Sequence, residues 1–265
     1  MKLLLLQTDI RWLSPDENRS RAADIIDRSP AADLIVLPEM FTTGFAVDPR
    51  GAAEPDGGAV TLDWMRRTAA RSDAAVAGSV AVTGERDGVE CCFNRFFFVR
   101  PDGSATTYDK RHLFSFGGEH LRYTPGTERV VVEWRGWRIL LQICYDLRFP
   151  VFARNRGDYD MMICVASWPT VRIHPWNTLL MARAIENVSY AVGVNRTGRD
   201  PLASYSGGTA LIDFRGGTVA AAEPDSEEAV FCEADIEALR AFRAKFPALN
   251  DADMFTITKA PNRLI

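Results

Sequence analysis

The sequence lacks any apolar run long enough to cross a membrane. No segment approaches the roughly 18 consecutive apolar residues that a membrane-spanning helix needs, so we expect no membrane partner. The apolar start of the chain, residues 1–6, is followed too soon by Gln7 and Asp9 for the apolar region of a signal peptide. We therefore interpret residues 2–9 as a first strand.

Metal-binding and disulfide signatures are also missing. There are three histidines without metal-ligand spacing, and neither an HExxH motif nor a CxxC pair, so we expect no metal site and no cofactor. The five cysteines are an odd number in a chain of 265 residues, which argues against a disulfide framework. Such cysteine usage favours a reducing, cytoplasmic location.

The chain also lacks the strong positive charge that nucleic-acid-binding proteins carry. Its formal net charge is −4, which argues against nucleic acid as a partner. Hydrophobic residues make up 47% and charged residues 25%, as in ordinary globular proteins with a sizeable core. No linker, repeat or low-complexity run divides the sequence, so we expect one domain over residues 1–265, with a core of about 1–245 and a C-terminal tail over 246–265.

Strand and helix patterns alternate along the chain. We expect strands at 2–9, 34–37, 74–82, 94–100, 104–108, 130–134, 137–143, 161–166, 191–194, 209–214, 218–222 and 230–233, and helices at 14–28, 61–71, 150–156, 175–190 and 235–245. Ser14 and Glu17 form a candidate capping box for the first helix, and Asp235 a cap for the last. This alternation predicts an α/β domain with a layered sheet covered by helices.

Cys144 lies where a predicted buried strand gives way to a turn. Pro150 then opens a helix that Gly157 ends. Open α/β sheets expose reactive groups at such strand ends, where free backbone N–H groups would favour the nucleophilic thiolate. Considered alone, Cys144 could equally be a structural cysteine that packs in the core as a small hydrophobic residue.

Two further reactive residues follow predicted strands. Glu39 comes after strand 34–37 and Lys110 after strand 104–108. A carboxylate in an apolar setting can deprotonate a thiol, and an ammonium can stabilise the oxyanion of a tetrahedral intermediate. A cysteine nucleophile divides amide hydrolysis into acylation and thioester hydrolysis. Separately, Glu39 also fits a surface or helix-start carboxylate, and Lys110 a solvated charge.

Three motifs in the chain closely resemble those of the nitrilase superfamily of carbon–nitrogen hydrolases. They are Leu37-Pro38-Glu39-Met40-Phe41, Tyr108-Asp109-Lys110-Arg111-His112-Leu113-Phe114 and Cys144-Tyr145-Asp146-Leu147-Arg148-Phe149-Pro150. Residues 42–45, 166–169, 182–187, 195–196 and 245–247 further resemble the omega-amidase branch, and within it the bacterial YafV type. The resemblance covers essentially the whole chain.

The resemblance implies a fold and a role for each matching residue. The fold would be a four-layer α-β-β-α sandwich. Cys144 would be the nucleophile, and Glu39 the general base that later protonates departing ammonia. Lys110 would stabilise the oxyanion together with the backbone N–H of Tyr145. Glu119, in the loop after the lysine, would orient Lys110 or assist the water, with a simple loop ion pair as the alternative.

The resemblance also implies an assembly. Members of this superfamily usually form homodimers, so we expect a homodimer or a higher homo-oligomer. The helix at 175–190 and the tail are the candidate contacts.

The omega-amidase resemblance also implies a substrate class. Such enzymes release ammonia from the terminal amide of 2-oxoglutaramate or 2-oxosuccinamate. The carboxylate of such a substrate needs a cation, for which Arg148 is the first candidate and Arg172 the second. The alternative for Arg148 is an ion pair with Asp146 or a helix-end contact. Phe45 and Trp168 would wall the short chain of the substrate, or else belong to the core.

Other reactions on the same fold remain open at this point. The alternatives are a deaminated glutathione amidase, an N-carbamoyl amino acid amidohydrolase or a nitrilase, since pocket details that no motif determines set specificity. The presence of Glu39, Lys110 and Cys144 together argues against a non-catalytic binding protein on this fold.

Overall fold

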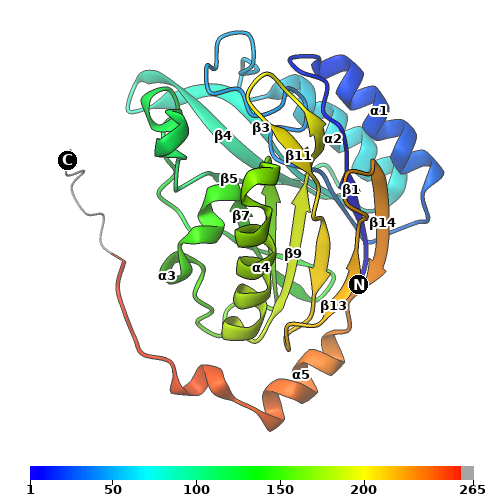
Figure 1. Cartoon of the computed structure of the whole chain (residues 1–265), viewed down its shortest axis with the longest axis vertical. Helices are drawn as coiled ribbons and strands as arrows, with labels where there is room; N and C mark the ends of the chain where they lie inside the picture. The colour runs from blue at the N-terminus through cyan, green and yellow to red at the C-terminus, as the bar shows by residue number, and fades with distance from the viewer. Residues whose placement is uncertain (258–265) are drawn as a thin grey trace.

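A computed structural model describes residues 1–257 of the chain; residues 258–265, the end of the expected tail, lie outside the description. Two six-stranded sheets form the centre, in the orders β14-β1-β2-β3-β4-β5 and β13-β12-β9-β8-β7-β6 (Figure 1). The first sheet consists of β1 (Lys2–Gln7), β2 (Leu34–Val36), β3 (Ala75–Arg86), β4 (Val89–Val99), β5 (Ala105–Asp109) and β14 (Glu228–Glu233). The second consists of β6 (Val131–Trp134), β7 (Trp137–Ile143), β8 (Met161–Ala166), β9 (Tyr190–Asn195), β12 (Ala210–Ile212) and β13 (Thr218–Ala221).

The α-helices pack around these sheets, on their outer faces and at their ends. They are α1 (Pro15–Arg28), α2 (Ala59–Ser72), α3 (Pro150–Ala153), α4 (Ile173–Asn187) and α5 (Ile236–Lys245), and a short strand pair, β10 (Thr197–Arg199) and β11 (Ser204–Ser206), stands apart. In Figure 1, α1 and α2 cover the first sheet and α4 covers the second. Among the described residues, none of the helices combines the length and the apolar character needed to cross a bilayer.

Strand alternation explains why the first sheet is buried on both faces. Successive side chains of a strand point to opposite faces. In β1, Leu3 and Leu5 pack in a core between the two sheets, whereas Leu4 and Leu6 pack against α1 and α2. All four side chains are almost fully buried, which explains the continuous apolar run at the start of the sequence.

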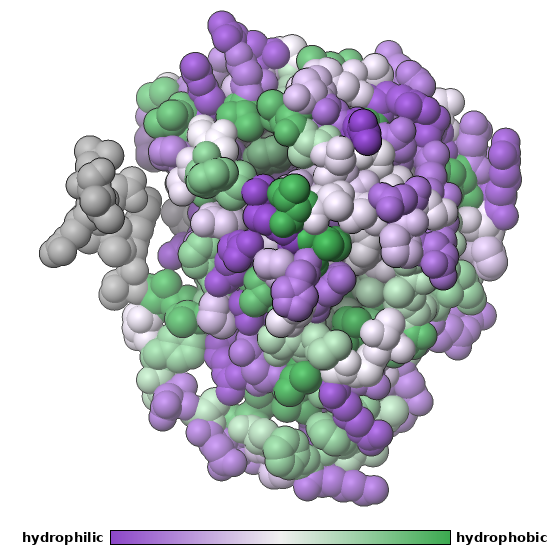
Figure 2. All heavy atoms as spheres, in the orientation of Figure 1, coloured by the Kyte–Doolittle hydropathy of each residue, from purple (hydrophilic) through white to green (hydrophobic). Residues whose placement is uncertain are grey.

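The second sheet repeats this arrangement. Ile139 and Leu141 of β7 join the core between the sheets, while Leu140 faces Trp176 and Leu180 of α4. The layers therefore follow the order helices, sheet, sheet, helices, and the predicted four-layer α-β-β-α sandwich is confirmed. On the face drawn in Figure 2, apolar side chains form small patches among polar ones.

The direction of the strands brings several strand ends to one place. β1, β2 and β3 are parallel, and so are β7, β8 and β9. β5 returns to the direction of β3, because β4 is antiparallel to both. The carboxyl ends of β2 and β5 in one sheet, and of β7 and β8 in the other, can therefore converge.

Two local predictions about helix ends were wrong. The Ser14 hydroxyl donates to the Trp12 carbonyl at 3.1 Å instead of accepting from the helix, so α1 begins without the expected capping box. The helix expected at 150–156 ends at Ala153, because the side-chain oxygen of Asn155 accepts the N–H groups of Gly157, Asp158 and Tyr159 and turns the chain. By contrast, the Asp235 carboxylate caps α5 as predicted.

Candidate active site

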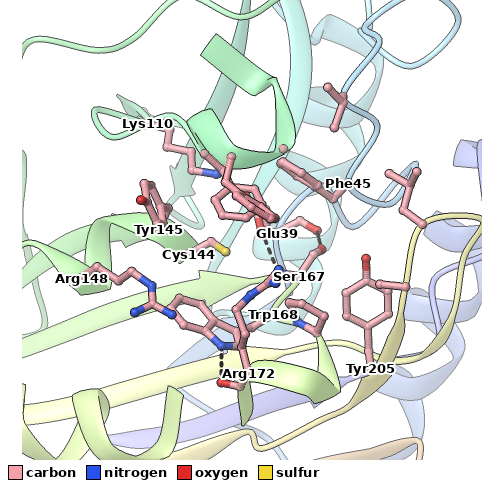
Figure 3. A pocket seen from close by; sticks show the side chains of 17 residues that line it. Glu39, Phe45, Lys110, Cys144, Tyr145, Arg148, Ser167, Trp168, Arg172 and Tyr205 are labelled. Atoms are coloured by element: carbon pink, nitrogen blue, oxygen red, sulfur yellow. Dashed lines mark hydrogen bonds and ion pairs between the residues drawn. The ribbon is translucent and has the colours of Figure 1, made fainter. Parts of the chain in front are cut away.

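Residues that follow strands of both sheets meet in one pocket (Figure 3). Glu39 comes three residues after the end of β2, and Lys110 follows β5 directly. Cys144 follows β7 and begins a short 3-10 helix, Cys144–Arg148, from the other sheet. The structure thus brings together the three reactive residues predicted from their strand-end positions.

The Lys110 ammonium lies between two carboxylates. Its Nζ atom is 2.8 Å from Glu39 Oε1 and 3.1 and 3.0 Å from the two oxygens of Glu119. All three side chains are fully buried. Burial alone lowers the pKa of Lys110, but the charges of Glu119 and Glu39 outweigh it and raise that pKa well above its usual value. Lys110 is therefore a permanent cation at neutral pH.

Glu119 is held by the loop that carries it. Its Oε2 atom accepts the backbone N–H of Phe114 at 2.6 Å, within the segment 111–126 that the sequence leaves without periodicity. Burial, together with the nearby Glu39 charge, raises the pKa of Glu119, while Lys110 opposes the rise. The Lys110 contacts make Glu119 more than an exposed loop ion pair.

Cys144 has a left-handed backbone conformation, with φ of +46°, which side chains other than glycine rarely adopt. Asp146 helps to hold the turn, because its Oδ2 atom accepts the backbone N–H of Ile143 at 3.0 Å and the Tyr108 hydroxyl at 2.7 Å. This sharp turn directs Cys144 into the pocket.

The thiol of Cys144 is not activated in the resting state. Burial raises the pKa of Cys144 well above its usual value, and the Glu39 charge adds to this, while Lys110 opposes it. The sequence-based expectation that free backbone N–H groups favour the thiolate stays a prediction. Because the resting group is a neutral thiol, its nucleophilic form requires a neighbouring base.

The pocket has a volume of about 320 Å³, which suits a small molecule. All the predicted substrate-contacting residues line it: Phe45, Tyr145, Arg148, Trp168 and Arg172. Tyr145 packs edge-on against Phe114 with ring centroids 5.1 Å apart. Glu119 lies behind Lys110 and is not part of the lining.

The two arginines rest on aromatic rings. The Arg148 guanidinium carbon lies 4.9 Å from the Trp168 ring centroid, and that of Arg172 lies 5.3 Å from the Phe114 ring centroid. The alternative pairing of Arg148 with Asp146 is wrong, because Tyr108, His112 and Ile143 occupy the Asp146 carboxylate. Both guanidinium groups remain at the pocket (Figure 3).

Two residues that complete the site were missed from the sequence. The Ser167 backbone N–H donates to Glu39 Oε2 at 2.8 Å. The Asn94 amide donates to Glu39 Oε1 at 2.8 Å. Ser167 follows β8 and could have been found by the strand-end argument, whereas Asn94 lies within β4 and carries no such signal.

Within residues 1–257, no group of three or more His, Cys, Asp or Glu side chains is arranged to hold a metal ion. The charged and nucleophilic groups that line the pocket are the Cys144 thiol, the Glu39 carboxylate, the Lys110 ammonium and two guanidinium groups, with Glu119 behind Lys110.

Comparison with known proteins identifies the family. The family model described as carbon–nitrogen hydrolase matches residues 3–244. The chain belongs to the carbon–nitrogen hydrolase family. A curated relative, omega-amidase YafV from Yersinia enterocolitica, is 46% identical over 97% of this chain and 98% of its own length. The 2-oxoglutaramate amidase of Bacillus subtilis is 33% identical over 93% of this chain and 95% of its own length.

Solved structures of other carbon–nitrogen hydrolases agree with this family and fold. A CN-hydrolase superfamily protein from Xanthomonas campestris, whose crystal structure contains an arsenic adduct in the active site, has a TM-score of 0.91 and 43% identity, covering 97% of this chain and 99% of the other. The predicted family and enzyme class are confirmed: this carbon–nitrogen hydrolase acts on the C–N bonds of amides.

Proposed function

We propose that the chain is an omega-amidase, in which Cys144 attacks the terminal amide of a short dicarboxylic monoamide and forms a thioester. One observation carries this proposal: the buried Lys110 ammonium lies between the Glu39 and Glu119 carboxylates, in the same pocket as Cys144. A base, a cation and a thiol are the groups that covalent amide hydrolysis needs.

Acylation begins with proton transfer. Glu39 takes the proton of the Cys144 thiol, whose raised pKa makes such a base necessary. The sulfur attacks the amide carbon, and the carbonyl π electrons move to the oxygen. When the tetrahedral intermediate collapses, the C–N bond breaks and Glu39 returns the proton to the nitrogen, which leaves as ammonia. The products of this half-reaction are ammonia and an acyl thioester.

The negative oxygen of the tetrahedral intermediate needs donors. Lys110 supplies an N–H by giving up one of its contacts to the carboxylates, and the backbone N–H of Tyr145 supplies the second. Glu119 keeps the ammonium in place, since it contacts Nζ with both of its oxygens.

Hydrolysis of the thioester repeats the same steps with water. Glu39, deprotonated again after the departure of ammonia, takes a proton from water while the hydroxide attacks the thioester carbon. The carbon–sulfur bond then breaks, the sulfur recovers a proton from Glu39, and the dicarboxylate leaves. Assistance to the water by Glu119, the other role that the resemblance implies, stays a prediction, because Glu119 lies behind Lys110 and outside the pocket lining.

We propose 2-oxoglutaramate and 2-oxosuccinamate as substrates. Arg148 binds the substrate carboxylate, with Arg172 as the second cation, because a guanidinium can bind a carboxylate through two hydrogen bonds. Phe45 and Trp168 wall the short chain between the cations and the thiol. The similarity to a 2-oxoglutaramate amidase and to omega-amidases supports this substrate class.

Ammonia release from 2-oxoglutaramate by the wild type and by Cys144→Ala tests the proposal. We expect release by the wild type and none by the variant, while the matched cysteine control Cys91→Ala, in β4, stays active. No release by the wild type would refute the substrate assignment. A panel of amides, N-carbamoyl amino acids and nitriles, with intact-mass detection of an acyl-enzyme, would then identify the alternative reaction.

We also propose that residues 1–265 form a single domain with a core over about 1–245, and that two copies associate through α4 and the tail. This is supported by Met181 and Ile185, apolar residues of α4 that are 41% and 49% exposed. Light scattering should give a dimer mass, reduced by Ile185→Glu; a monomeric wild type would contradict the assembly.

We also propose a reducing, cytoplasmic location, with which the free thiols of all five cysteines are consistent.

A further inference from the structure

Asn94 contacts both buried carboxylates of the site through its side chain and Lys110 only through the backbone, although it lies within a strand. Its side-chain Nδ2 atom is 2.8 Å from Glu39 Oε1 and 3.4 Å from Glu119 Oε1. Its backbone carbonyl accepts a hydrogen bond from the backbone N–H of Lys110 at 2.9 Å. The side chain is 1% exposed, so it makes these contacts without competition from water.

The chemistry of the amide matters as much as its position. The cluster holds two carboxylates and one ammonium, and the three contacts of the ammonium all go to those carboxylates. A further hydrogen-bond donor to the two carboxylates should therefore be uncharged and should keep its protons over the whole pH range in which the enzyme is active. An Asn amide meets both conditions, whereas an acid of the same shape donates only when it is protonated.

The contact with Glu39 also restricts how that carboxylate can face the thiol. Oε1 accepts from both Lys110 and Asn94, and Oε2 accepts from the Ser167 backbone N–H. With three donors in place, the carboxylate plane cannot rotate without losing a buried hydrogen bond. The remaining lone pair of Glu39 Oε2, which can accept the proton of Cys144, is therefore held in a fixed orientation.

We propose that Asn94 is a positioning residue that separates Glu39 from Glu119 and orients Glu39 toward Cys144. This inference rests on the proposed role of Glu39 as the base. The titratable groups around the amide are Glu39, Glu119, Lys110 and Cys144, and Tyr123 lies close enough to Glu119, Lys110 and Cys92 to sense their charges.

The test compares Asn94→Asp, which preserves shape, and Asn94→Ala with the wild type. The matched control is Cys92→Ser, a near-isosteric change two residues away in β4. At pH 7.5 we expect kcat/KM to fall about 100-fold in Asn94→Asp and about 10-fold in Asn94→Ala, and to stay within threefold in Cys92→Ser.

The pH profile distinguishes positioning from a purely structural role. In Asn94→Asp the introduced carboxyl donates only when it is protonated, so relative activity should recover as the pH falls from 7.5 to 5.5, opposite to the wild type. Asn94→Ala adds no titratable group, so its loss of kcat/KM should not show this recovery at low pH. If Asn94→Ala does not fold, Asn94→Asp alone decides.

A second readout needs no substrate. The rate at which iodoacetamide alkylates Cys144, followed by peptide mass, should fall at least about tenfold at pH 7.5 in Asn94→Asp and stay unchanged in Cys92→Ser. This separates failure of the inference from failure of the proposed function, because it holds even if 2-oxoglutaramate is not cleaved. Folded variants with wild-type alkylation rates and unchanged pH limbs would overturn the positioning role.

Discussion

The two ends of the pocket are built differently. At the inner end, Glu39, Lys110 and Glu119 are fully buried and joined by hydrogen bonds of 2.8–3.1 Å. At the mouth, Phe116 and Leu202 are 86% and 61% exposed. The cations near the mouth, Arg148 and Arg172, lie on aromatic rings instead.

This difference suggests that the inner end serves the catalytic chemistry and the mouth serves substrate choice. A buried ionic network has few alternative arrangements, because each lost contact leaves an unpaired charge in a medium of low dielectric constant. Such a network suits a catalytic step that is the same for every substrate. Exposed residues at the mouth can be substituted singly at little cost in stability, so they suit the selection of the substrate.

The largest effect is expected from Lys110→Met at the inner end. Without the ammonium the oxyanion loses a donor, and kcat should fall at least about 1,000-fold. The buried carboxylates also lose their counter-charge, which should lower the free energy of unfolding by about 3–5 kcal/mol at pH 8. The matched control is Lys245→Met, at the exposed end of α5.

The loss of stability in Lys110→Met should depend on pH. Burial already raises the pKa of Glu119 above its usual value, and removal of the opposing Lys110 charge raises it further. A carboxyl with a raised folded pKa stabilises the fold when it is protonated and destabilises it as the pH rises through that pKa. Urea unfolding should therefore show a smaller defect at pH 5 than at pH 8; an equal defect would contradict the buried charge cluster.

Glu119→Gln should have the next largest effect. It keeps the shape of the side chain but removes the charge that contributes most to raising the pKa of Lys110. We expect kcat to fall about 100-fold, and the alkaline limb of the kcat/KM profile to move to lower pH as Lys110 loses its proton more easily. A variant with wild-type kcat would show that Lys110 needs only Glu39.

At the mouth, Arg148→Leu should act mainly on binding. If Arg148 holds the substrate carboxylate, KM should rise about 10- to 100-fold while kcat changes less than about threefold. The rise in KM of Arg172→Leu, measured under the same conditions, shows which of the two arginines contributes more to substrate binding. With a neutral short amide as substrate both variants should match the wild type, and a defect there would mean that the arginines serve the chemistry or the fold.

The smallest effect is expected from Phe116→Ala. This side chain is 86% exposed, and its ring is tilted by 50° against that of Phe114 at a centroid distance of 5.8 Å. The free energy of unfolding should change by about 0.5 kcal/mol or less, and kcat/KM by less than about threefold. A larger change in KM would extend the substrate site to the rim and weaken the distinction between the two ends.

Much of the site was predictable because three of its residues follow strands. Lys110 and Cys144 directly follow strands and Glu39 comes three residues after one, and parallel strands end at one edge of a sheet. Asn94 was not predictable in this way. It lies inside β4, between Phe93 and Arg95, and its amide meets two carboxylates only because Glu39 and the loop 111–126 pack on that strand.

Local helix ends show a similar limit. The sequence around Asp235 predicts its cap correctly, because the cap depends on backbone N–H groups two and three residues away. The predicted box at Ser14 and Glu17 failed because the Ser14 hydroxyl donates to Trp12 in the preceding turn, while Asn18 ties that turn to the Thr42 carbonyl.

Most of the strands and helices and the three motifs that define the family were readable from the sequence, because periodicity and turn chemistry are local, whereas the short strands β10 and β11 were missed. Only the tertiary structure decided that Cys144 rests as a neutral thiol, since its pKa depends on burial and on Glu39 more than 100 positions away in the chain. It also decided that Arg148 faces the pocket, because Tyr108 and His112 come from the other sheet and its loop to occupy Asp146. Charges and hydrogen bonds between distant segments depend on distances that only the folded chain sets.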